Sequence, residues 1–147
     1  MSGIVCAVRG GPNSRPTIDR AVRLAQETGL DLHFLYVVNL DFLTHTTSTR
    51  VRTISQEMRQ MGEFILASAQ SKAETQGVAA QSDIRQGDVG EEIVNLCREL
   101  EANYLVMGRP QLGEEGSIFT QERLRSFIAD TEEQTGAQVV LPEGETE

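Results

Sequence analysis

Short apolar runs alternate with segments of helical periodicity along the whole chain, and this alternation restricts the possible folds more than any other feature. Continuous apolar runs occupy residues 4–8 and 104–107, and residues 30–38 begin with alternation and finish fully apolar. Runs of this length are typical of strands buried on both faces, as in a parallel sheet. Between them, apolar residues recur three and four positions apart, which predicts helices with one buried face.

The predicted helices begin and end at recognisable residues. The first is expected to stop at Gly29, and a long helix of about seven turns is expected to stop at Gly77. Asp88 and Glu91 have the spacing of a capping box, so they predict the start of a third helix. A last helix is expected to stop at Gly136.

Two further segments complete a β-α-β-α-β-α-β-α-β order. Residues 78–85 alternate polar and apolar side chains and predict an edge strand, and residues 138–141 predict a final strand before Pro142. The chain has 147 residues, which suits one domain. We therefore predict a single α/β domain over residues 2–142, with a doubly wound parallel sheet covered by helices on both faces, and a disordered acidic tail at 143–147.

Composition excludes several kinds of partner. The net charge of −9 argues against nucleic-acid binding, because an acidic chain repels phosphodiester backbones. The apolar runs are too short to span a membrane, and the N-terminus lacks a secretory signal, so we expect a cytoplasmic protein. Cys6 and Cys97 are far apart and are expected to be small buried residues rather than a disulfide or a metal site.

Parallel sheets bind ligands at the carboxyl ends of their strands, which directs attention to residues 9–14 and 108–117. Gly10 and Gly11 could let the backbone approach an anion at a helix start, or could simply form a tight turn. Gly108 has the same two interpretations, and Arg109 could bind a phosphate or lie at the surface. The sequence leaves both pairs of alternatives open.

No catalytic residue or metal site is predicted. Neither histidine has an acid or serine spaced to form a triad, and Lys72 is the single lysine, which excludes a P-loop. Four carboxylates gather in sequence near the expected third helix, but capping and the helix dipole explain acids at a helix start. These carboxylates belong to Asp83, Asp88, Glu91 and Glu92.

Taken as an ordered set, several segments resemble the universal stress protein family. The matching segments are residues 4–8 with the glycine-rich turn that follows, 32–38, 87–93, 104–108 and 139–141. The resemblance implies a five-stranded parallel sheet in the order 3-2-1-4-5, of the adenine nucleotide alpha hydrolase-like kind. It also implies homodimers, often formed by the last strands, which here contain Gln138, Val139, Val140 and Leu141.

Members of that family that bind ATP carry an acid at the end of the first strand. They also carry Gly, two residues, Gly, nine residues and Gly-Ser/Thr after the fourth strand. Here Arg9 replaces the acid, Gly108 matches the first glycine, Gln111 replaces the second, and Arg125-Ser126 stands at the Gly-Ser position. Residues 120–128 read as continuous helix, and residues 112–147 carry nine acidic and two basic residues. Both features oppose the usual binding of a triphosphate.

The resemblance therefore implies a non-enzymatic, dimeric stress-response domain with weak, altered or absent binding of ATP or another adenine nucleotide, acting on a regulatory protein partner. A phosphate loop relocated to Gly116-Ser117 is one alternative. An ATP-pyrophosphatase-like enzyme, suggested by residues 9–14, and a flavodoxin-like electron carrier are weaker ones. The candidate nucleotide-binding residues are Ala7, Val8, Arg9, Gly10, Gly11, Val37, Met107, Gly108, Arg109 and Ser126.

Overall fold

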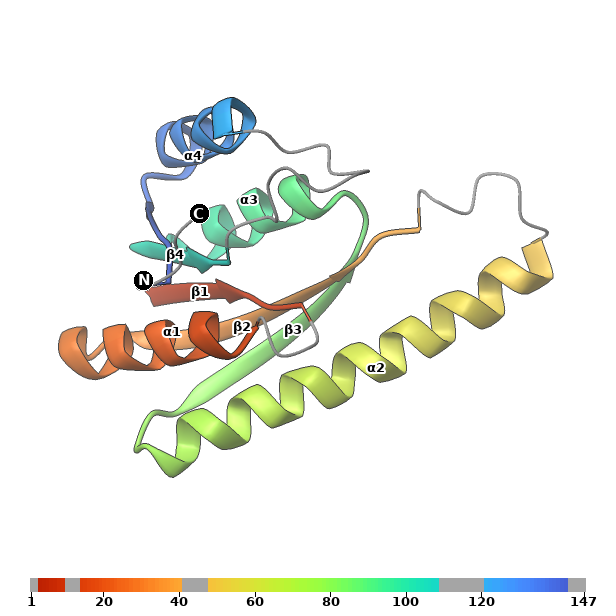
Figure 1. Ribbon diagram of the computed structural model, residues 1–147, viewed down its shortest axis with the longest axis horizontal. Coiled ribbons are helices and arrows are strands. Elements are labelled where there is room, and N and C mark those ends of the chain that lie inside the picture. The colour runs from red at the N-terminus through yellow and green to blue at the C-terminus, as the bar shows by residue number, and fades with distance from the viewer. Residues whose placement is uncertain (1–2, 10–13, 41–47, 109–120, 143–147) are drawn as a thin grey trace.

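Strands and helices alternate strictly along the chain in the computed structural model (Figure 1). The structure describes residues 3–9, 14–40, 48–108 and 121–142. The expected order of elements is confirmed within these residues. The elements are β1 (Gly3–Ala7), α1 (Ser14–Thr28), β2 (Asp31–Val38), α2 (Ser48–Thr75), β3 (Ala80–Gln86), α3 (Val89–Leu100), β4 (Tyr104–Met107), α4 (Gln121–Thr135) and β5 (Gln138–Val140).

The five strands form one parallel sheet in the order β3-β2-β1-β4-β5. This confirms the predicted fold and places β3 at an edge, as its polar alternation indicated. Strand boundaries differ from the predicted ones by one or two residues, and β5 ends at Val140 rather than residue 141. The apolar pattern marks which residues are buried, whereas backbone pairing fixes where a strand ends.

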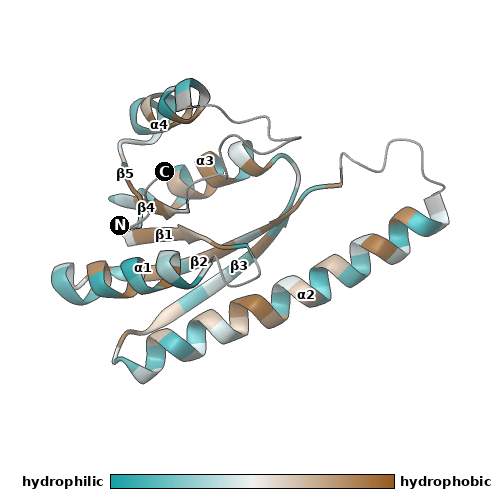
Figure 2. Ribbon diagram, viewed as in Figure 1, coloured by the Kyte–Doolittle hydropathy of each residue, from teal (hydrophilic) through white to brown (hydrophobic). Residues whose placement is uncertain are grey.

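Two helices cover each face of the sheet (Figure 1). On one face, α1 and α2 pack with Ile4, Phe34 and Val106 in one buried cluster. On the other face, α3 packs with Leu35 and Leu105 in a second cluster, and α4 lies against α3 and β5. The central strand β1 supplies residues to both clusters, which is why its sequence is continuously apolar and is coloured so in Figure 2.

Helix α2 has 28 residues and extends past the sheet at its N-terminal end (Figure 1). Its second half contributes Leu66, Ala69 and Ala73 to the core, and Lys72 forms an ion pair with Asp19 of α1 at 2.9 Å. The opposite side carries two large apolar side chains with high exposure, Met61 at 59% and Phe64 at 73%. The apolar periodicity of α2 therefore reflects burial only in part.

Glycines end the helices where the sequence predicted. Gly29 after α1 has φ +74°, and Gly77 after α2 has φ +82°, both in the left-handed region that favours glycine. The backbone turns at these residues and enters the next strand.

No described helix is both long enough and apolar enough to cross a membrane.

Candidate functional site

The carboxyl ends of β1, β2 and β4 lie side by side at the point where the strand order reverses. Ala7 at the end of β1 is opposite Leu35 of β2 and Met107 of β4 in the sheet register. From β1 the chain proceeds to β2 and β3 on one side, and later to β4 and β5 on the other. In open α/β sheets this reversal creates a crevice that binds ligands.

Three half-buried apolar side chains from these strands share one face of the sheet. Ala7, Val37 and Met107 all pack against the cluster on the α3 side. Val8 lies on the other face, where it is 4% exposed, and its N–H donates to the Leu35 carbonyl at 2.9 Å. Of the candidate nucleotide-binding residues, Ala7, Val37 and Met107 are thus brought together on one face of the sheet, and we call these three the apolar floor. The Val8 side chain lies on the other face.

Gly108 follows β4 and touches the start of α1. A Cβ atom at this position would lie 3.0 Å from Oγ1 of Thr17, whose side chain is 2% exposed. Because Thr17 is buried in the first turns of the helix, a larger residue at 108 would have to displace it. Close packing between β4 and α1 therefore disfavours a larger residue here whether or not a ligand binds, and sequence reasoning did not identify Thr17 as the reason.

Positive charge gathers where β1 leads to α1. Arg9 is exposed, and its carbonyl accepts a hydrogen bond from the Ser14 hydroxyl at the helix start. The first turn of α1 contains Arg15 and no acidic residue, so the positive end of the helix dipole is not neutralised from within that turn. Gly10, Gly11 and Arg109 lie outside the described residues.

The segment that holds Gly-Ser in ATP-binding relatives is helical here. Arg125 and Ser126 lie inside α4, and both are exposed. The prediction of continuous helix is confirmed from Gln121 onward, and residues 109–120 lie outside the described residues. Ser126 is the sixth residue of α4, so helical geometry directs its N–H to a carbonyl one turn earlier rather than to a ligand.

The start of α3 is capped by the chain itself. Asp88 accepts a hydrogen bond from the Glu91 N–H at 3.0 Å, which confirms the predicted cap. This bond occupies one of the free donors that make a helix N-terminus attractive to anions. The first turn of α1 contains Arg15 and no acidic residue, so the start of α1 is the more favourable of the two places for a phosphate.

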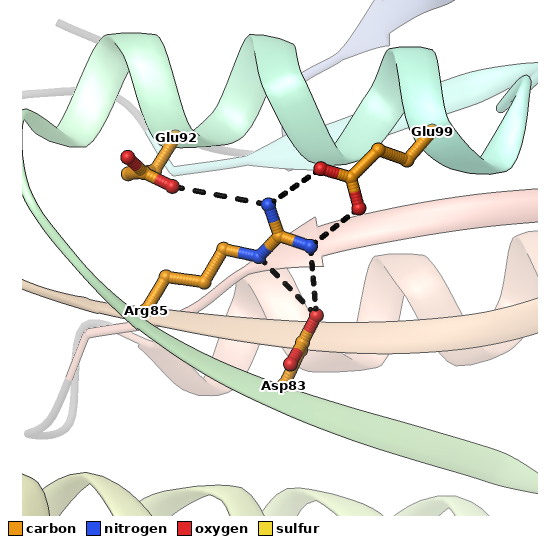
Figure 3. Close-up of polar contacts among 4 residues, drawn as sticks. All are labelled: Asp83, Arg85, Glu92 and Glu99. Atoms are coloured by element: carbon orange, nitrogen blue, oxygen red, sulfur yellow. Dashed lines mark hydrogen bonds and ion pairs between the residues drawn. The ribbon is translucent and has the colours of Figure 1, made fainter.

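Arg85 of β3 gathers carboxylates that sequence reasoning considered as metal ligands (Figure 3). Its guanidinium contacts Asp83 at 3.3 Å and Glu92 at 3.8 Å, and makes two bonds of 2.7 and 2.9 Å to Glu99 of α3. The hydrogen bond from Arg85 lowers the pKa of Glu99 below its ordinary value of 4.5. Glu92 and Glu99 thus fasten α3 to β3 through Arg85, and Asp83 holds the same guanidinium from within β3.

Among the residues that the structure describes, histidine, cysteine and acidic side chains form no group of three or more that could hold a metal ion. Both cysteines are buried and free, as predicted, and burial raises the pKa of the Cys97 thiol to about 12. Burial also raises the pKa of Cys6 well above its usual range. Neither cysteine is a thiolate nucleophile near neutral pH, because the thiolate form requires a lowered pKa.

Comparison with known proteins agrees with this architecture. A family model described as "Universal stress protein family" matches residues 1–121. The chain belongs to the universal stress protein family. Within that family, "Universal stress protein YxiE" of Bacillus subtilis (strain 168) is 28% identical over 113 residues, which cover 71% of this chain and 76% of YxiE.

Solved structures of universal stress proteins share the fold. The UspA protein of Lactobacillus plantarum has a TM-score of 0.77 at 16% identity, and the match covers 97% of both chains. A universal stress protein from Archaeoglobus fulgidus, solved in complex with dAMP, has a TM-score of 0.62 at 15% identity and covers 97% of this chain and 98% of its own. At these identities the likeness shows the fold, and the ligand belongs to that relative.

Proposed function

We propose that this universal stress protein is a non-enzymatic, dimeric regulatory domain of the cytoplasm that binds an adenine nucleotide weakly and in an altered manner. The proposed nucleotide binding rests on the groups that lie at the carboxyl ends of the strands. An apolar floor of Ala7, Val37 and Met107 lies at the strand ends, the exposed Arg9 follows Ala7 by two residues, and the next helix starts with no acidic residue in its first turn. We call these four residues the strand-end site.

The floor suits an adenine ring. Its three side chains come from adjacent strands, lie on one face and keep partial exposure, as an apolar surface that receives a flat base must. The relative solved with dAMP shares this fold, which supports an adenine nucleotide as the ligand class.

The phosphate position is expected to differ from that of ATP-binding relatives. Arg9 stands where those relatives carry an acid, so this end of the site attracts an anion instead of a ribose hydroxyl. On the opposite side, α4 is helical through Ser126, and Glu122 is exposed in its first turn. A single phosphate near Arg9 is therefore favoured, and additional phosphates directed toward α4 meet negative charge.

The proposal of a non-enzymatic role rests on the groups available for chemistry. The cysteines are buried, Lys72 pairs with Asp19 behind the sheet, and Asp83 and Glu92 bind Arg85. None of these groups faces the strand-end site as a nucleophile or general base. Incubation with ATP should therefore yield neither ADP nor AMP above the spontaneous rate.

The dimer is proposed to form through residues 138–141 of the last strand. β5 is an edge strand, and its outer side offers backbone groups to a second copy of the chain. The proposed regulatory role then requires a protein partner that binds this dimer.

Isothermal titration with AMP, ADP and ATP tests the nucleotide part. We expect weak binding of AMP, with no gain in affinity from AMP to ATP, and a loss of about tenfold in Arg9→Glu. Arg98→Glu is the matched control, because Arg98 is exposed in the last turn of α3 and undergoes the same charge change. Tight ATP binding that Arg9→Glu leaves unchanged would support a relocated phosphate loop instead. Absence of any binding at about 1 mM nucleotide would remove the nucleotide part altogether.

A further inference from the structure

The outer edge of β5 already has a partner within its own chain. Gln138 donates its N–H to the Asn103 carbonyl at 2.9 Å, toward the interior of the sheet. Backbone groups alternate along a strand, so the N–H and carbonyl of Val139 point outward, away from β4. The Val139 N–H donates at 3.0 Å to the Glu132 carboxylate of α4.

The Ala137 N–H, just before β5, also has an acceptor in α4. Ala137 donates to the Thr135 hydroxyl at 3.0 Å, and that hydroxyl in turn donates to the Thr131 carbonyl. The last turns of α4 thus supply acceptors for the Ala137 N–H just before β5 and for the outward Val139 N–H within it. Native proteins commonly protect edge strands against pairing, and here the protection is a specific carboxylate.

We propose that Glu132 closes the outer edge of β5 and limits how strongly two copies of this chain pair through that strand. This inference rests on the dimer proposed above, and it adds that Glu132 regulates the strength of that dimer. In an antiparallel pair centred on Val139, each Val139 N–H would bond to the Val139 carbonyl of the other copy. The same N–H cannot also serve Glu132, so each copy must release its carboxylate before the strands join.

The competition sets the size of the expected effect. One hydrogen bond is lost per copy, and therefore two are lost per dimer. If each bond is worth about tenfold in the association equilibrium, removing both acceptors strengthens pairing about 100-fold. The carboxylate is half-buried between α4 and β5, so water competes with it only in part.

Sedimentation equilibrium of the full chain tests this directly. Glu132→Ala removes the acceptor, and we expect its dimer dissociation constant to fall about 100-fold below that of the unmodified chain. Glu132→Gln keeps an oxygen acceptor but loses the charge, so its dissociation constant should lie between the two. Glu133→Ala is the matched control, because Glu133 is the next residue of the same helix, is exposed and carries the same charge.

Two measurements locate the new contact at β5. Glu132→Ala combined with Val139→Pro should lose the gain in association, since proline has no N–H and an outward position of an edge strand tolerates it. If the combined variant fails to fold, hydrogen exchange in Glu132→Ala alone gives the answer. The Val139 amide should exchange quickly in dilute, monomeric protein and slowly at concentrations where the dimer forms.

The outcomes separate the two proposals. Equal dissociation constants for the unmodified chain and Glu132→Ala refute the role of Glu132. If Val139→Pro nevertheless abolishes the dimer both in the unmodified chain and in Glu132→Ala, the chain dimerises through β5 and Glu132 does not limit that pairing. If no variant self-associates, or if Val139→Pro leaves the dimer dissociation constant unchanged, then both proposals are refuted: pairing through β5 and its regulation by Glu132.

Discussion

Gly62 lies in the middle of α2 and faces the sheet, so its replacement by alanine measures how closely the long helix packs. A Cβ atom at this position would lie 2.7 Å from Cε2 of Tyr36 and 2.9 Å from Cδ1 of Ile84, with Cδ2 of Tyr36 closer still. Both neighbours belong to strands, β2 and β3, which the register holds in place. The helix or the Tyr36 ring must therefore move to admit one methyl group.

Two opposing effects determine the result. In an exposed helix interior, Gly→Ala stabilises by about 1 kcal/mol, because alanine loses less backbone entropy. Overpacking a closely fitted site costs about 1–3 kcal/mol. We expect overpacking to exceed the propensity gain at Gly62, for a net loss of up to about 2 kcal/mol and a fall in Tm of up to about 8 °C.

Urea unfolding followed by circular dichroism provides the measurement, with the midpoint lowered and the m-value unchanged. Ala67→Gly is a control for propensity alone, because Ala67 is exposed on the same helix, and it should cost about 1 kcal/mol. Truncating Tyr36 to leucine removes the two closest overlaps and should reduce the cost of Gly62→Ala, while the contact with Ile84 remains. An increase in stability for Gly62→Ala in the unmodified background would refute this account of the α2 interface.

Two other predictions concern charge and burial. Arg85→Met should destabilise the protein mainly at neutral pH. Because the pKa of Glu99 is lowered in the folded state, the pair stabilises the fold above about pH 4.5 and loses this effect as acid protonates the carboxyl. The difference in unfolding free energy between the two proteins should therefore shrink as the pH falls below that range, and a difference that stays constant would contradict the assignment. Cys97, with a pKa raised to about 12 by burial, should not react with a thiol reagent at neutral pH until the protein unfolds; rapid labelling of native protein would show that the α3 core is open.

Much of the fold could be predicted because local pattern and tertiary burial agree. The run at β1 is apolar throughout because its two faces pack against different clusters. The stop after α1 was visible because Gly29 has a left-handed φ that favours glycine. The Asp88 cap was also visible, since its bond spans only three residues.

Contacts between distant segments were less accessible to this reasoning. Glu92 read as an acid near a helix start, and only the packing of α3 beside β3 shows that Arg85 holds it. Gly108 read as a candidate ligand contact, and the tertiary structure places it against Thr17. In both cases the deciding neighbour lies on another element, outside the range of any local pattern.

The class of fold and the positions of the elements could be predicted from the amino-acid sequence, and the family resemblance identified Arg9, two residues after β1, as the replacement of an acid. These features could be predicted because apolar periodicity, turn residues and residue identity are all visible within one short segment of the sequence. The tertiary structure decided which residues share the floor of the strand-end site and that Glu132 reaches the outer edge of β5. Such pairings depend on how α4 and the strands pack together, because a hydrogen bond between side chain and edge exists only when both elements are in place.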